Sequence, residues 1–301
     1  MYTRVYEYQE GQNKRFRVIG FKGFRPLGVG ERAEPSEYEK KFDESLCRTR
    51  RTIRDLILCN RFAYFCTFTF NDSKIDRYDL HACKKGITNF FHDFRQKYAP
   101  DFRYLIVPER HKDEAWHFHG VVWGIPRGEL TVPASITVRN RQTQQLREVP
   151  NTKGYVRWER YSKKFGHFDC SSIKHYEACA AYVSKYITKA LSDLAKSTHL
   201  YFCSSGLARP DLVFDQDDVP FVLQPEHEDE FCKIAWASGR DVIGTYLPEW
   251  YDEWCSDVRA PEQLPQGMNR AQLENYIFEP LTGAQLSLLE AAEQVSVPWE
   301  L

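Results

Sequence analysis

The stretch FRYLIVPERHKDEAWHFHGVVWG, residues 102–124, contains two apolar runs separated by a short polar link. The runs at 102–109 and 116–124 are rich in β-branched and aromatic side chains, which favour strands. The link RHKDEA, residues 110–115, is short enough for a hairpin connection. The pattern therefore predicts two antiparallel strands lying side by side.

The second of these runs carries a pair of histidines. Alternate residues of a strand point to the same face, so His117 and His119 share one face while Phe118 points to the other. Two converging imidazoles can hold a divalent ion, although such a pair is also typical of two unrelated surface histidines. If the hairpin forms, Glu109 lies near them and completes a His-His-carboxylate set with open coordination positions, as a catalytic metal requires. The alternative for Glu109 is a surface charge close to a turn.

A second pattern lies further along the chain, in YVSKYITK, residues 182–189. It contains Tyr-x-x-Lys twice, as Tyr182 with Lys185 and Tyr186 with Lys189. The helical periodicity of residues 175–196 predicts one helix that presents both pairs in an arc beside its apolar stripe. Such an arc is equally typical of the half-exposed face of a helix. Tyr186 lies nearer the stripe, which favours Tyr182 as the first choice of nucleophile.

These residue types fit one kind of chemistry. Tyrosine is a weak nucleophile because its free pKa is near 10, so it requires activation. A nearby ammonium group stabilises the phenoxide, and a metal ion on a target phosphate lowers the barrier to attack. Tyrosine, lysine and a His-His-Glu set are what transesterification of a phosphodiester to tyrosine requires.

The order of the motifs resembles that of the HUH endonucleases, the rolling-circle replication initiators of small phages and plasmids. CTFTF at 66–70 resembles the first motif of that family, HFH at 117–119 matches the second, and YVSK at 182–185 matches the third. Glu109 falls where many members place a carboxylate ligand. The doubled Tyr-x-x-Lys helix is most similar to phage initiators, and SSGLARP at 204–210 resembles a segment that often follows that helix. The resemblance covers about residues 46–210.

The resemblance implies an α+β fold, with a central antiparallel sheet and flanking helices related to the ferredoxin-like and RNA-recognition arrangements. It implies nicking of single-stranded origin DNA by tyrosine attack, which leaves a 5′-phosphotyrosine link and a free 3′-OH, and later rejoining of the ends. We expect Mg2+ or Mn2+ as cofactor, with the imidazoles favouring Mn2+. Lys185 and Lys189 would stabilise charge on the phosphate or phenoxide, and the two tyrosines would attack in turn.

Three other functions remain open at this point. A relaxase or transposase of the same fold would move DNA without replicating an origin. A catalytically silent origin-binding or repressor protein would bind DNA without nicking it. A zinc phosphoesterase acting on small substrates would have no use for the tyrosine helix.

The charges are divided unevenly along the chain. Residues 211–301 contain 4 Lys and Arg against 19 Asp and Glu, whereas residues 1–210 contain 37 against 23. This split predicts a domain that binds a polyanion and an acidic C-terminal segment, although a chance distribution of solvated charges would look the same. We therefore divide the chain into an N-terminal extension (1–45), an endonuclease domain (46–210) and an acidic segment (211–301).

Within the middle region, residues 125–168 are broken by Pro and Gly, and the stretch 127–164 carries nine Lys and Arg against three Glu. We expect a mobile basic excursion that tracks single-stranded DNA. The residues expected to contact DNA are Thr67, Thr69, Arg139, Arg141, Lys163 and Lys164.

Several common features are missing from the sequence. It contains no G-x-x-x-x-G-K phosphate loop, so we expect a host helicase and the replication machinery as partners. No apolar run approaches the roughly 18 residues of a membrane span, and no apolar core of a signal peptide is present. Nine cysteines without a C-x-x-C pair favour reduced thiols in a cytoplasm. The oligomeric state is left open.

Overall fold

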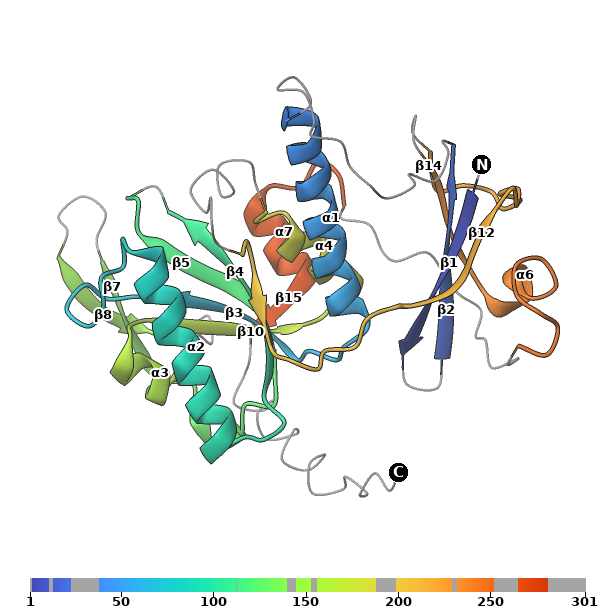
Figure 1. Ribbon diagram of the computed structural model, residues 1–301. Coiled ribbons are helices and arrows are strands. Elements are labelled where there is room, and N and C mark those ends of the chain that lie inside the picture. The colour runs from blue at the N-terminus through green and yellow to red at the C-terminus, as the bar shows by residue number, and fades with distance from the viewer. Residues whose placement is uncertain are drawn as a thin grey trace. The chain divides into compact units, whose positions relative to one another are not determined.

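The computed structural model describes residues 2–10, 13–22, 38–111, 113–139, 145–152, 156–187, 199–228, 232–251 and 265–280. The fold is α+β with antiparallel sheets, as the sequence predicts (Figure 1). The chain forms two compact units. Unit 1 comprises Met1–Arg61, Ala180–Lys185 and Ser205–Leu264, and unit 2 comprises Phe62–Cys179, Tyr186–Ser204 and Pro265–Leu301.

Unit 1 contains a five-stranded sheet in the order β12-β1-β2-β14-β13. Its strands are β1 (Tyr2–Glu10), β2 (Asn13–Phe21), β12 (Asp211–Asp217), β13 (His227–Glu228) and β14 (Cys232–Ala237). Its helices are α1 (Tyr38–Leu58), close to the helix expected over 36–59, and α6 (Gly239–Val242). Arg17 of β2 forms an ion pair with Asp55 of α1 at 2.8 Å.

This sheet changes the division drawn from charge. Strands from the N-terminal extension pair directly with strands from the acidic segment, β1 with β12 and β2 with β14. The alternation of apolar and polar residues in β1 and β2 requires partners for the buried face, and Val5, Phe16 and Val18 form a core with Ala237 and Val242. Residues 1–45 and 211–264 therefore belong largely to one structural unit.

Unit 2 is built on a six-stranded antiparallel sheet in the order β11-β4-β5-β3-β10-β15. Its strands are β3 (Tyr64–Thr69), β4 (Arg103–Arg110), β5 (Trp116–Trp123), β10 (Phe168–Ile173), β11 (Phe202–Cys203) and β15 (Phe278–Pro280). The predicted hairpin of β4 and β5 is confirmed, with Glu109 paired opposite His117.

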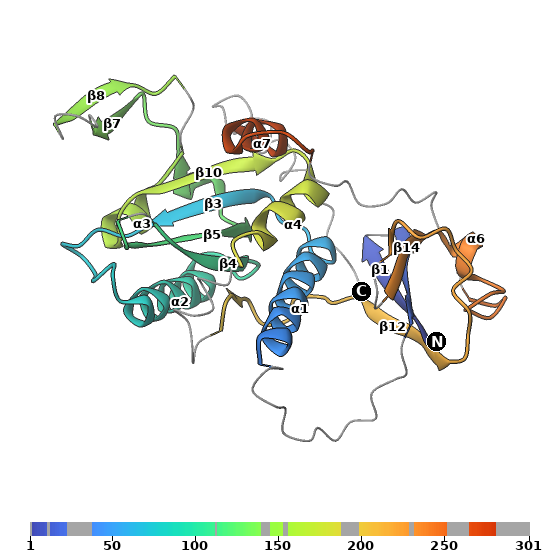
Figure 2. The same cartoon turned by 90° about the horizontal axis from the view of Figure 1, so that it is seen from above.

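One face of this sheet is covered by α2 (Leu80–Lys97), which both views show running beside the strands (Figures 1 and 2). The helix begins at the N-cap Asp79, whose carboxylate accepts hydrogen bonds from the backbone N–H groups of His81 and Ala82. Its phenylalanines repeat at helical spacing, and Phe91 packs on Phe68 of β3 with ring centroids 5.5 Å apart. The opposite face is left for polar residues.

The basic excursion is more ordered than the sequence suggests. Two small sheets lie in it, β6 (Leu130–Thr131) with β9 (Arg157–Trp158), and β7 (Ser135–Arg139) with β8 (Leu146–Pro150). They are accompanied by the 3-10 helix η2 (Arg127–Glu129) and by α3 (Glu159–Lys164). Trp158 and Tyr161 are fully buried against the phenylalanines of α2. The prediction of mobility is wrong for residues 156–168, because aromatic anchors hold them in the core.

The tyrosine-bearing helix, α4 (Tyr176–Ser184), is shorter than expected. Lys185 and Tyr186 are in a turn, and residues 188–196 of the predicted helix lie outside the described residues. The prediction of continuous helix is therefore wrong at 185–187, and the last helix of the described chain is α7 (Arg270–Ile277). Among the described residues, no helix has the length and apolar character that a bilayer crossing requires.

Candidate active site on the open face of the sheet

Polar side chains gather on the sheet face opposite α2. Strand alternation places His117 and His119 on this face, while Phe118 points to the α2 side, where its ring contacts Phe70. Glu109 lies opposite His117 across the hairpin, and its Oε2 is 2.7 Å from Nε2 of His119. The imidazole pair and the carboxylate expected from the sequence are thus brought together.

Two threonines orient the histidines. Oγ1 of Thr67 lies 3.1 Å from Nδ1 of His119, and Oγ1 of Thr69 lies 3.4 Å from Nδ1 of His117. A partner on Nδ1 sets the ring orientation and leaves Nε2 to act on the open side. The sequence suggested DNA contacts for Thr67 and Thr69, whereas the structure places their hydroxyls on the histidines.

The protonation states in the site suit cation binding. Burial lowers the pKa of His117 to about 4, and the nearby His111 and His119 rings contribute to this lowering, so the ring is neutral at pH 7 with a lone pair available. Burial opposes ionisation of Glu109, yet the hydrogen bond and charge of His119 and the charge of Arg270 hold its carboxyl pKa below the usual value. Glu109 is therefore a carboxylate at neutral pH.

The donor types fit Mg2+ or Mn2+, since neutral imidazole and carboxylate are ligands of such ions. In the described part of the chain, no three His, Cys, Asp or Glu side chains are already gathered into a metal cage. Instead, Glu109 and His119 are joined by a hydrogen bond, and His117 stands at the next position of the same face. An ion would have to replace that hydrogen bond.

The two tyrosines have different surroundings. The ring of Tyr186 stacks on the imidazole of His119, with centroids 4.5 Å apart and planes inclined by 7°. Tyr182, the nucleophile favoured by the helical pattern, is only 5% exposed. The helical arc was drawn for a helix that continues past Ser184, and the turn at 185–186 instead places Tyr186 beside the histidines. Lys185 is exposed, and Lys189 lies outside the described residues.

Sequence reasoning missed Arg270, which comes from the acidic segment. Its Nη2 lies 3.4 Å from the hydroxyl of Tyr186, and its Nη1 lies 3.9 Å from Oε1 of Glu109. Phe278, from the same segment, stacks on Phe65 of β3 at 4.4 Å. The available signals were an Asn-x-x-Gln capping pattern at 269–272 and the scarcity of basic residues after 210.

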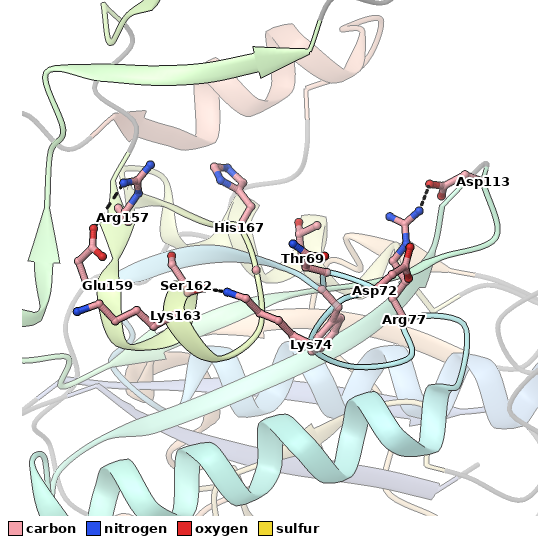
Figure 3. Close-up of a pocket in the computed structure, with 13 residues that line it drawn as sticks. Thr69, Asp72, Lys74, Arg77, Asp113, Arg157, Glu159, Ser162, Lys163 and His167 are labelled. Carbon is pink, nitrogen blue, oxygen red and sulfur yellow. Dashed lines mark hydrogen bonds and ion pairs between the residues drawn. The ribbon is translucent and has the colours of Figure 1, made fainter. Parts of the chain in front are cut away.

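A groove of about 940 Å3 adjoins the site at Thr69. Figure 3 shows Lys74 and Lys163 near Ser162, and the ammonium of Lys74 donates to the Ser162 carbonyl at 2.7 Å. Two further cations line the groove, Arg77 and Arg157. The floor is held together by backbone bonds from Thr69 N–H to the His167 carbonyl and from Asn71 N–H to the Phe165 carbonyl.

Each carboxylate in this groove is engaged by an arginine. Arg77 contacts Asp72 and Asp113, each at 3.1 Å, and Arg157 contacts Glu159 at 3.6 Å. The lysine ammonium groups therefore dominate the electrostatic potential of the groove.

The remaining expected DNA contacts are dispersed. Lys163 is exposed in the groove, whereas Nζ of Lys164 lies 5.6 Å from the ring centroid of Phe90. Arg139 ends β7, and Arg141 lies outside the described residues.

Gly120 allows β4 to approach β5. A Cβ atom at this position would lie 2.0 Å from the Leu105 carbonyl oxygen. We expect Gly120→Ala to lower the free energy of unfolding by about 1–3 kcal/mol, because the strand carrying Glu109 must move away. Thermal unfolding measures this change. Gly128→Ala is the matched control, since nothing lies within 4 Å of its added Cβ. Equal melting temperatures for both variants would contradict the close approach.

Residues 63–191 match the family model of the replication-associated protein ORF2. The matched region includes Glu109, His117, His119 and both tyrosines. Comparison with curated proteins and with solved structures finds no match. The family match associates this chain with DNA replication and is consistent with an initiator of rolling-circle replication.

Proposed function

We propose that this protein is a metal-dependent endonuclease and strand transferase that initiates rolling-circle replication by tyrosine transesterification. The observation that carries the proposal is the position of Tyr186, whose ring lies on the candidate metal ligand His119. A tyrosine stacked on an imidazole of a His-His-Glu set has its hydroxyl where a phosphate bound at the set would be attacked. The family match to replication-associated proteins supports this use.

In the proposed reaction, Oη of Tyr186 attacks the phosphorus of a DNA phosphodiester. A Tyr–O–P bond forms, the bond from phosphorus to the 3′ oxygen breaks, and the phenolic proton ends on that oxygen. One phosphodiester replaces another, so the reverse attack by a 3′-OH can rejoin the ends. The 5′ end stays on the protein, and the free 3′-OH can prime synthesis.

The chain's own residues prepare this step. His117, His119 and Glu109 would hold Mg2+ or Mn2+, which when bound would polarise the scissile phosphate. Thr67 and Thr69 keep the imidazoles in orientation through Nδ1. The stacked His119 ring restricts the rotation of the Tyr186 ring, which limits the entropy lost on reaching the attack geometry.

The groove lined by Lys74 and Lys163 is the proposed path of the single strand. Phe70, the aromatic residue of its lining, is 2% exposed and offers no face for base stacking. Contacts there would be made to phosphates and would tolerate many sequences.

Lys74→Ala/Lys163→Ala is expected to weaken binding of a labelled mixed-sequence single-stranded oligonucleotide about tenfold. The slope of log affinity against log salt should fall by about 1.4, since each single-strand phosphate contact contributes about 0.7. Fluorescence anisotropy at several salt concentrations measures both. Lys85→Ala/Lys97→Ala removes the same charge from exposed positions of α2 outside the groove and should bind like wild type. Equal losses in the two double variants would exclude the groove as the path.

The function itself is tested by incubating the full chain with labelled single-stranded origin DNA and Mn2+. An SDS-resistant adduct carrying the label 3′ of the nick is the expected result, and peptide mapping should locate the DNA on Tyr186. DNA binding without any adduct would instead identify a catalytically silent origin-binding protein.

A further inference from the structure

The acidic C-terminal segment contributes a side chain to the proposed active site. Arg270 contacts the hydroxyl of Tyr186 at 3.4 Å and the carboxylate of Glu109 at 3.9 Å. It is one of four basic residues after position 210. A cation placed against the reacting oxygen of a nucleophile is the kind of group that activates it.

The fold fixes the position of this arginine through several independent contacts. The first turn of α7 is closed by a capping box, in which Asn269 and Gln272 exchange side-chain and backbone hydrogen bonds. Leu273 and Ile277 are buried on the inner face of the helix. The Ile277 carbonyl accepts a hydrogen bond from Lys174 N–H at 2.9 Å.

The strand after the helix extends the same sheet that carries the histidines. Phe278 of β15 pairs with Ile173 of β10, and its ring stacks on Phe65. Phe65 in turn lies parallel to the His119 ring, with centroids 6.1 Å apart. The segment 269–280 is therefore anchored at both ends of α7, which makes the placement of Arg270 a property of the fold.

The guanidinium of Arg270 is accessible to a substrate. Its Nε lies 2.8 Å from Glu274, and its two Nη atoms face Tyr186 and Glu109. The side chain is 62% exposed, so a DNA strand can reach it. The fork of five N–H donors matches the geometry of a phosphate and can exchange one acceptor for another as the strand binds.

We propose that Arg270 is a catalytic residue that stabilises the Tyr186 phenoxide and the negative charge developing on the attacked phosphate. This inference rests on the proposed function, and it assigns to the C-terminal segment the role that the sequence pattern gave to Lys185 and Lys189. The reaction consumes no further reactant, because Arg270 stays protonated throughout and only the phenolic proton moves.

The charged and titratable groups facing the Tyr186 hydroxyl decide its pH response. His119 lies under the ring, Glu109 lies beyond the guanidinium, and Glu274 contacts Arg270 from the next turn of α7. Removing Arg270 leaves two carboxylates near the hydroxyl without their cation, which disfavours the phenoxide. The active form should then require a higher pH.

The test is the rate of adduct formation between the full chain and labelled single-stranded origin DNA in Mn2+, measured under single-turnover conditions across pH. Arg270→Ala is expected to slow the reaction roughly 10- to 100-fold at neutral pH, somewhat less than the loss of a buried donor because this side chain is partly solvated. The pH of half-maximal rate should rise by about one unit. Arg270→Lys should recover part of the rate and most of the profile.

Two controls separate chemistry from folding. Glu274→Gln removes the i,i+4 partner of Arg270 but keeps the guanidinium, so its rate and profile should stay near wild type. Alanine has the highest helix propensity, so Arg270→Ala should unfold at nearly the wild-type temperature. An unchanged rate in Arg270→Ala, or a loss that is equal at every pH, would overturn the assignment while leaving the proposed function intact. If wild type itself forms no adduct, the proposed function fails instead.

Discussion

Tyr186→Phe is expected to abolish the covalent protein–DNA adduct, whereas Tyr182→Phe is expected to form it at close to the wild-type rate. The phenylalanine ring preserves the stacking on His119, so the substitution removes only the attacking oxygen. Loss of a nucleophile that cannot be replaced lowers the rate on the order of 10⁴-fold or more. Tyr182 is 5% exposed, which leaves its hydroxyl little access to DNA.

The comparison of single and double variants decides how many tyrosines react. Adduct in both single variants and none in Tyr182→Phe/Tyr186→Phe would support alternating attack, the reaction expected from the doubled motif. Adduct in Tyr186→Phe and none in Tyr182→Phe would restore the order drawn from the helical pattern. Adduct that persists in the double variant would contradict tyrosine transesterification altogether. Gel analysis after SDS treatment distinguishes these results.

His117→Ala and His119→Ala are expected to abolish Mn2+-dependent cleavage while leaving most of the affinity for single-stranded DNA. A metal on the phosphate contributes several kcal/mol to the transition state, and each 1.36 kcal/mol is a factor of ten in rate. We therefore expect losses on the order of 10³-fold. Binding should persist because lysines and arginines that contact phosphates supply most of the affinity.

Direct metal binding gives a readout independent of cleavage. Titration of Mn2+ followed by electron paramagnetic resonance should show a bound ion in wild type and a much weaker one in either histidine variant. Glu109→Ala should weaken binding less, since two imidazoles remain. His92→Ala, at an exposed position of α2, is the matched control and should behave as wild type. Undiminished cleavage by His117→Ala/His119→Ala would rule out the metal site.

Local sequence was sufficient to predict the strand elements of the site. The alternation in 116–124 determined that His117 and His119 share one face, because side chains of a strand alternate regardless of what the strand packs against. The short link 110–115 determined the hairpin, and with it the nearness of Glu109. The spacing of the phenylalanines predicted α2 and its buried side for the same reason.

The tertiary structure alone decided which tyrosine meets the histidines. A helical pattern assigns faces only as long as the helix continues, and α4 ends at Ser184. The turn that follows rotates Tyr186 out of the predicted arc and onto His119. The threonines of β3 were assigned to DNA because periodicity shows the face on which a side chain lies but not the neighbour that it contacts there.

The contribution of Arg270 also required the fold. It lies far along the chain from the histidines, in a segment whose net charge suggested a separate acidic region. Its position results from pairing of β15 with β10 and from burial of Leu273 and Ile277. Long-range strand pairing and burial depend on complementary surfaces made by distant parts of the chain, whereas local periodicity reports only on neighbours within a few residues. For that reason the sequence by itself determined the sheet face that bears the histidines, and only the tertiary structure decided which tyrosine and which cation stand on it.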